Sequence, residues 1–186
     1  MAISTADFRN GMCIEYNNKL CTIVEFQHVK PGKGGAFVRT KLRDIKTGRV
    51  VDYTFNAGTK FDSVRLETKK MQFLYSDGTD FNFMDMSSFE QLSIPAETVG
   101  SAANWLKEND EATLMYAGDE LISIEPPMFV ELEVTDTEPG FKGDTATGAS
   151  KPATLETGAQ IKVPLFINIG DKLKIDTRTG EYLARA

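Results

Sequence analysis

The chain of 186 residues is long enough for one large domain or for two to three small ones. Hydrophobic residues make up 41% and charged residues 26%, which is typical of soluble globular proteins and excludes a wholly disordered chain. The net charge is −6, no apolar run approaches the roughly 18 residues that span a bilayer, and the N-terminus lacks a secretory signal. We therefore expect a cytoplasmic protein that does not use a membrane.

The charge is unevenly distributed along the chain. Residues 1–64 carry ten Lys and Arg against six Asp and Glu, a balance of +4, whereas residues 65–127 carry four against twelve, a balance of −8. A basic N-terminal third on an acidic protein predicts one localised contact with a polyanion. Chance clustering of charge is the alternative.

Short β-prone runs separated by turn residues fill the first third. Strands are expected at residues 12–16, 20–29, 37–43 and 50–55. Asn17-Asn18 and Lys46-Thr47-Gly48 supply turns. Residues 1–64 are thus predicted to form a small barrel.

Cys13 and Cys21 flank the first of these turns among apolar neighbours. In a reducing cytoplasm we expect buried free thiols, with a disulfide as the alternative. A metal site is not expected, because His28 is the only histidine and no C-x-x-C spacing occurs.

Residues 65–127 begin with a hairpin signal, in which Met71, Phe73 and Tyr75 alternate on one face before a Ser-Asp-Gly turn. Phe81 and Phe83 continue the alternation. Pro95 precedes a helix expected at 96–109, and two strands are expected at 112–116 and 121–125. This combination fits an OB-like barrel.

Pro126-Pro127 predicts a boundary, so residues 128–186 form the third unit. Strands are expected at Phe129–Thr137, 160–167, 172–176 and 182–184, with a long loop at 138–157. The prediction is an all-β protein of three small barrels in series, with one short helix in the second.

Lys33 lies in the middle of the predicted hairpin loop at residues 30–36. Three residues on each side could carry it roughly 10 Å beyond the barrel. Gly32, Gly34 and Gly35 remove side chains around it, and Pro31 restricts the base of the loop. One ammonium group is thereby held away from the bulk of the protein.

Behind the loop, Arg39, Lys41 and Arg43 recur at a period of two and share one face of their strand. With Lys30 at the loop base, they form a basic stripe suited to a phosphate backbone. A solvated hairpin with ordinary surface charges is the alternative.

Catalysis has little support in the sequence. Lys33 followed by Gly34 does not match a Walker loop, and no G-x-S-x-G motif occurs. The carboxylates of residues 65–127 fall in turns or exposed stretches, where solvation explains them better than acid–base work. Trp105 is expected in a hydrophobic core. The aromatic residues of the first hairpin are also expected there, rather than in a platform for stacking bases, because the −8 unit would repel phosphates.

These residues resemble the bacterial elongation factor P family. H-V-K-P-G-K-G at 28–34, F-M-D at 83–85 and E-L-E-V at 131–134 carry the resemblance, with K-P-A at 151–153. The third unit adds fixed points at Gly158, Ile161, Val163, Pro164, Ile167 and Gly170. A lone P-G-K-G loop would be weak evidence for the resemblance, whereas this combination of motifs is strong and extends over essentially the whole chain.

The resemblance implies that the first barrel is of the SH3-like type and that two OB barrels follow it, in an L shape like that of tRNA. It implies binding to the ribosome between the peptidyl and exit sites, where the factor relieves stalling at consecutive prolines. Lys33 would contact the CCA end of peptidyl-tRNA and would be extended by a lysine-modifying enzyme, often by lysylation. No cofactor is implied, and we expect a monomer.

Two other classes compete with this interpretation. A general binder of single-stranded nucleic acid predicts a broad basic groove with exposed aromatics, whereas the positive charge here is confined to residues 1–64. An enzyme using Lys33 as a nucleophile would need desolvation to lower the lysine pKa, which a glycine-flanked loop tip does not provide.

Overall fold

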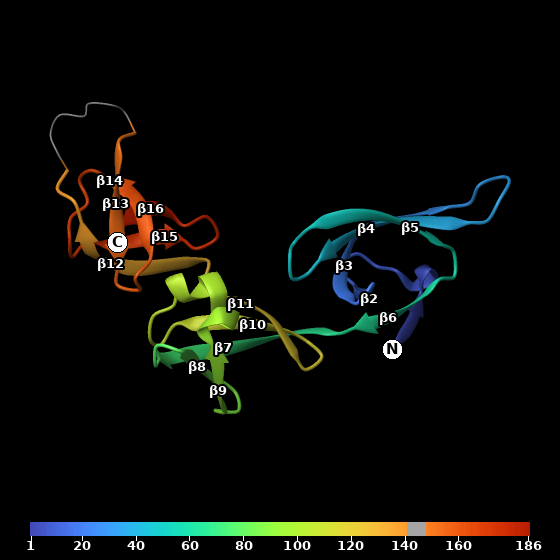
Figure 1. Ribbon diagram of the computed structural model, residues 1–186, viewed down its shortest axis with the longest axis horizontal. Helices are drawn as coiled ribbons and strands as arrows, with labels where there is room; N and C mark the ends of the chain where they lie inside the picture. The colour runs from blue at the N-terminus through green and yellow to red at the C-terminus, as the bar shows by residue number, and fades with distance from the viewer. Residues whose placement is uncertain (141–147) are drawn as a thin grey trace. The chain divides into compact units, whose positions relative to one another are not determined.

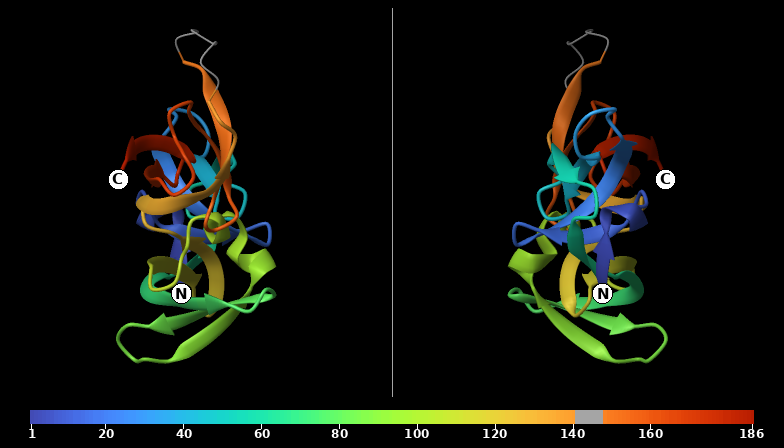
Figure 2. Two further views of the ribbon diagram at one scale, coloured as in Figure 1. Left: turned by 90° about the vertical axis from the view of Figure 1, so that its left-hand side faces the viewer. Right: turned by 90° about the vertical axis from the view of Figure 1, so that its right-hand side faces the viewer.

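The protein is all-β, as the sequence predicts. A computed structural model describes residues 1–140 and 148–186, and in this part of the chain three curled sheets account for the fold (Figures 1 and 2). By contact density the chain forms two compact units, residues 1–68 with 115–123, and residues 69–114 with 124–186. The division into domains at 64/65 and 127/128 stays a prediction.

The first sheet has the strand order β1-β6-β2-β3-β4-β5. Its elements are β1 (Ala2–Ser4), the 3-10 turn η1 (Thr5–Asp7), β2 (Cys13–Tyr16), β3 (Lys19–Val29), β4 (Phe37–Asp44), β5 (Val50–Asn56) and β6 (Lys60–Val64). The four predicted strands are confirmed. The sequence prediction missed β6 and its pairing partner β1, a strand of three residues that is too short to show apolar alternation.

A cluster of aromatic side chains fills the core that this curled sheet encloses. Phe8 packs against Phe61 with ring centroids 5.4 Å apart, and Phe55 meets Tyr16 at 5.2 Å and Phe61 at 4.8 Å. Each fully buried aromatic contributes on the order of 1.5–3 kcal/mol through the apolar area it removes from water. Ile23 of β3 and Val38 of β4 belong to the same buried cluster, so this core anchors the two strands that carry the candidate site.

Cys13 and Cys21 are buried free thiols, as predicted. Burial raises the pKa of the Cys13 thiol to about 11, and burial also raises the pKa of Cys21. Both side chains therefore act as small core residues, since the thiolate needed for reactivity is disfavoured.

The second sheet has the order β11-β10-β7-β8-β9. Its strands are β7 (Leu66–Ser76), β8 (Asp80–Asp85), β9 (Gln91–Pro95), β10 (Glu111–Ala117) and β11 (Glu120–Glu125). The prediction that Met71, Phe73 and Tyr75 share one face of the first hairpin is wrong for Tyr75. Met71 and Phe73 are buried, but a register shift between Phe73 and Tyr75 leaves Tyr75 50% exposed.

The predicted helix at 96–109 is much shorter in the structure. Helix α1 (Ala96–Val99) gives way to a 3-10 turn, η2 (Gly100–Asn104). Gly100 has φ = +61°, a left-handed conformation that interrupts regular α-helical hydrogen bonding. Trp105 follows η2 and packs, partly buried, against the core of the third sheet, which agrees with its predicted packing role.

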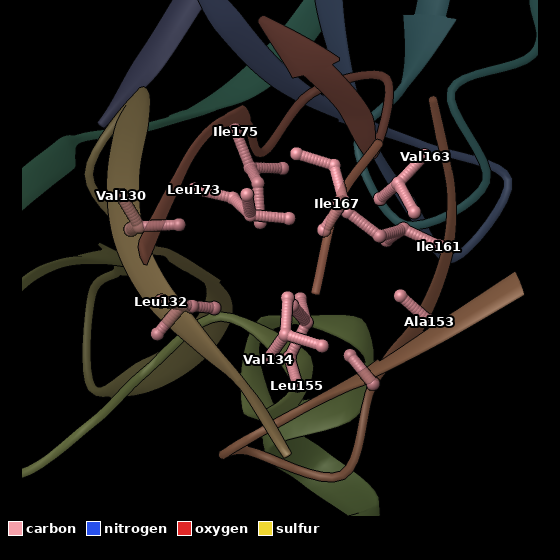
Figure 3. Packing of buried hydrophobic residues seen from close by; sticks show 11 residues of the cluster. Val130, Leu132, Val134, Ala153, Leu155, Ile161, Val163, Ile167, Leu173 and Ile175 are labelled. Atoms are coloured by element: carbon pink, nitrogen blue, oxygen red, sulfur yellow. The ribbon is translucent and has the colours of Figure 1, made fainter. Parts of the chain in front are cut away.

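The third sheet has the order β14-β13-β12-β15-β16. Its strands are β12 (Phe129–Thr137), β13 (Ser150–Leu155), β14 (Gln160–Pro164), β15 (Lys172–Asp176) and β16 (Glu181–Arg185). Figure 3 shows its core, in which Val130, Leu132 and Val134 of β12 point toward Leu173 and Ile175 of β15. The alternation predicted for β12 is therefore confirmed.

Two predictions in the third sheet are wrong in extent. Residues 150–155 form β13 rather than a loop, because their side chains alternate between the core and solvent. Residues 141–147 of the predicted loop lie outside the described residues. Strand β14 ends at Pro164 rather than at 167, because Pro164 pairs with Ser150, the first residue of its partner strand β13.

Gly140 supplies a test of the third sheet's packing. A Cβ atom at this position would overlap the backbone carbonyl oxygen of Leu165. We expect Gly140→Ala to lower the free energy of unfolding by about 1–3 kcal/mol, measured by urea denaturation. The matched control is Gly35→Ala, where the added Cβ meets nothing within 4 Å. Equal stability of the two variants would contradict this packing.

Candidate functional site

The loop bearing Lys33 occupies residues 30–36, between β3 and β4, as the sequence predicts. The ladder of the two strands continues to its last pair, Val29 with Phe37, so the loop begins where pairing ends. Lys30 and all residues from Pro31 to Gly35 are exposed. Figure 1 shows the loop in blue, extending beyond the sheet at the end of the β3–β4 hairpin. Lys33 therefore stands at an exposed tip.

The three glycines of the loop are not equivalent. Gly34 has φ = +103°, which is unfavourable for residues with a side chain. Gly32 and Gly35 have no such φ, and a Cβ at either position would meet nothing within 4 Å. Nothing within the described chain requires glycine at these two positions. Their lack of side chains leaves Lys33 open to close approach by an external surface.

The predicted basic stripe lies on β4. Arg39, Lys41 and Arg43 are exposed, while the alternating Val38, Thr40 and Leu42 are buried. The stripe thus faces solvent while the intervening side chains hold β4 to the core. The guanidinium of Arg39 lies 5.7 Å from the ring centroid of Phe37, the first residue after the loop.

Two carboxylates flank the middle of the stripe, and the sequence prediction missed both. The register places Glu25 of β3 on one side of Lys41 and Asp52 of β5 on the other. The Lys41 ammonium forms an ion pair with Glu25 at 3.0 Å. The hydrogen bond that the Lys41 ammonium donates to Glu25, together with the negative charges of Glu25 and Asp52, raises the pKa of Lys41 above its ordinary value.

A groove of about 250 Å³ runs over these residues. Its lining includes Glu25 and Gln27 of β3, Arg39 and Lys41 of β4, and Asp52 and Thr54 of β5. Arg43 lies two residues beyond Lys41 on the same face and does not line the groove. The structure therefore joins Arg39 and Lys41 in one concave surface and leaves Lys30 and Lys33 in the loop.

The signal for the missed carboxylates was present in the sequence. A loop at residues 30–36 makes 29 and 37 opposite each other, and counting back along both strands gives 27 with 39 and 25 with 41. The bulge at 23–25 comes only after this pair. Register counting from the predicted loop would therefore have found Glu25.

Other candidate sites have structural roles. Asp77 accepts backbone hydrogen bonds from Thr79 and Asp80, and Asp85 accepts them from Ser87 and Ser88. These bonds lower the pKa of both carboxyls, which cap turns. Among the described residues, no group of three or more His, Cys, Asp and Glu side chains could hold a metal ion.

In the aromatic hairpin, Phe73 stacks on Phe81 at 5.2 Å and contacts the fully buried Phe83 at 5.5 Å. These rings lie in or against the core, as expected, and of this hairpin's aromatic residues only Tyr75 is largely exposed to solvent.

No helix in the described part of the chain is long and apolar enough to cross a membrane.

Three family models match nearly the whole chain. The elongation factor P KOW-like domain matches residues 4–61, its OB domain matches 66–124 and its C-terminal domain matches 130–185. The elongation factor P of Pelotomaculum thermopropionicum is 56% identical over 183 residues, covering 98% of this chain and 99% of that protein.

Solved structures with low sequence identity share the fold. The eukaryotic translation initiation factor 5A from Methanococcus jannaschii is 20% identical, with a TM-score of 0.50, and covers 67% of this chain and 95% of its own. A translation initiation factor eif-5a family protein from Naegleria fowleri is 16% identical, with a TM-score of 0.55, covering 67% of this chain and 97% of its own.

The fold and these matches define a translation elongation factor. The chain belongs to the elongation factor P family.

The ion pair at the centre of the stripe can be tested by titration. Because Glu25 is the largest cause of the raised Lys41 pKa, Glu25→Gln should lower that pKa toward its ordinary value. NMR titration of the Lys41 side chain in both proteins measures the change. Glu15→Gln, which changes an exposed glutamate on β2 of the same sheet, should leave the Lys41 pKa unchanged. An unaltered Lys41 pKa in Glu25→Gln would show that the pair does not form in solution.

Proposed function

We propose that this chain binds the ribosome beside the peptidyl-tRNA and stimulates peptide-bond formation at stalled polyproline sequences. The observation that carries the proposal is the exposed Lys33 tip, which is open to external approach on both sides through Gly32 and Gly35. Membership of the elongation factor P family supports a site of action in translation. We place the chain in the cytoplasm, as a monomer.

The contribution of Lys33 would be positional. Proline restricts the backbone geometry of both reacting residues, which slows their arrival at a reactive arrangement. A group that holds the CCA end of the tRNA in place lowers the entropy cost of that arrangement. The ribosome would perform the chemistry, and the chain itself would have no catalytic residue and no cofactor.

The exposure of Lys33 also suits covalent extension by a lysine-modifying enzyme. A four-carbon stem ending in an ammonium at a glycine-flanked tip is accessible to such an enzyme and can be lengthened without disturbing the sheet. An extension would let the tip reach further toward the tRNA end. Lys30, Arg39, Lys41 and Arg43 would contribute contacts to the RNA backbone behind it.

Substitution of Lys33 tests the proposed role directly. Lys33→Ala should keep the free energy of unfolding within about 0.5 kcal/mol of the wild type, because the side chain is exposed. It should remove the relief of stalling, so that output from a proline-run message falls severalfold in an in vitro translation assay while a proline-free message is unaffected.

Lys60→Ala is the matched control, since Lys60 is an exposed lysine on β6 of the same sheet. It should behave as the wild type on both messages. Equal output from Lys33→Ala and the wild type on the proline-run message would refute the role of Lys33.

The stripe makes a separate prediction about electrostatics. Arg39→Glu should weaken association with ribosomes and reduce the slope of log affinity against log salt by about one, because one phosphate contact is lost. Pelleting with ribosomes across a salt series measures both quantities. Lys60→Glu introduces the same acidic side chain away from the stripe and should change little. Unchanged pelleting of Arg39→Glu would exclude Arg39 from the interface.

A further inference from the structure

The outer face of β3, β4 and β5 is not a uniform track for phosphates. Lys41, the middle cation of the stripe, lies between Glu25 and Asp52, and both carboxylates line the same groove as Arg39 and Lys41. A carboxylate repels phosphate, so two of them weaken any site whose only task is to hold polyanions. The groove offers hydrogen-bond acceptors as well as cationic donors.

The carboxylates of Glu25 and Asp52 differ in whether they are ion-paired with Lys41. Glu25 accepts a hydrogen bond from the Lys41 ammonium at 3.0 Å, which directs that side chain. A lysine ammonium has three donors, so two remain for another acceptor. Asp52 is exposed and, among the ion pairs of the described residues, Lys41 is paired with Glu25 rather than with Asp52. Asp52 therefore keeps its acceptor capacity for a ligand.

This pairing of donors and acceptors matches the chemistry of a ribonucleotide. Its phosphate accepts hydrogen bonds, whereas its ribose hydroxyls can donate them to a carboxylate, as they do to the acidic residue of dinucleotide-binding folds. The 2′-hydroxyl is also the group by which a protein distinguishes RNA from DNA. A volume of about 250 Å³ falls just below the range of cofactor and drug sites, which begins near 300 Å³. The groove is therefore limited to a small unit of a polyanion and does not hold a longer stretch.

We propose that the groove over β3, β4 and β5 is a subsite for one ribonucleotide, in which Arg39 and Lys41 bind phosphate and Asp52 accepts a hydrogen bond from a ribose hydroxyl. Glu25 is a positioning residue that holds the Lys41 ammonium. The subsite rests on the proposed function, because it names the chemical unit of the tRNA that the stripe behind the Lys33 loop would contact.

The subsite can be tested with a matched pair of oligonucleotides. The full ¹⁵N-labelled chain is titrated with the ribo form and with the deoxy form of the trinucleotide CCA, and amide shifts give the site and both Kd values. The ribo form should shift amides of residues 25–27, 39–41 and 52–54 and bind about fivefold tighter or more, the effect of one additional hydrogen bond.

Asp52→Ala should reduce the ribo-to-deoxy preference to below about twofold without weakening the binding of the deoxy form, since a negative charge is removed. Asp62→Ala, an exposed aspartate on β6 of the same sheet, should keep the wild-type preference. Three results would overturn the subsite: equal Kd values for the two forms in the wild type, shifts located outside the groove, or an unchanged preference in Asp52→Ala.

The translation assay with Lys33→Ala tests the proposed function independently of the oligonucleotide titration. If the two oligonucleotides bind equally and Lys33→Ala still abolishes relief at proline runs, the subsite is wrong and the function stands. If the groove prefers the ribo form and Lys33→Ala has no effect on translation, the subsite stands and the function fails.

Discussion

The antiparallel register of β3 with β4 determines where every residue of the candidate site lies, since one ladder sets the loop, the stripe and its neighbours. Pairing ends at Val29 and Phe37, which leaves seven residues to carry Lys33 beyond the sheet. Burial of Val38 and Leu42 turns the alternate residues of β4 outward. A slip of one residue would turn Arg39 and Arg43 toward the core and expose Val38 and Leu42 to solvent. The hydrophobic pattern of β4 therefore stabilises the same register that the candidate site requires.

That register also decides the electrostatics of the site. The N-terminal third is basic in total, but its stripe is interrupted at Lys41 by Glu25 and Asp52, which come from strands on either side. Net charge predicts that a polyanion approaches this part of the protein. The placement of individual carboxylates determines which chemical group of that polyanion each position can accept. Lys33 differs from the stripe because it stands on a glycine-flanked loop rather than on the sheet.

Much of this arrangement could be predicted from the sequence. The β-prone runs that end at Val29 and begin at Phe37 marked the bounds of the loop, and the period of two in β4 and β12 separated core from surface. The failures have local causes. The positive φ of Gly100 shortened the helix, a bulge turned Tyr75 outward, and the three residues of β1 are too few to show periodicity. Glu25 and Asp52 were missed because charge was summed along the chain rather than across strands. The roles of Lys33 and of the stripe stay predictions.

The most direct measurement is site-specific photocrosslinking from position 33 to a ribosome that carries peptidyl-tRNA stalled on a proline run. A photoreactive residue in place of Lys33 should form its adduct with the 3′ end of the peptidyl-tRNA. The same residue in place of Thr47, in the turn at the other end of β4, should not. Adducts from position 33 that avoid the tRNA end, or adducts equal to those from position 47, would contradict the account.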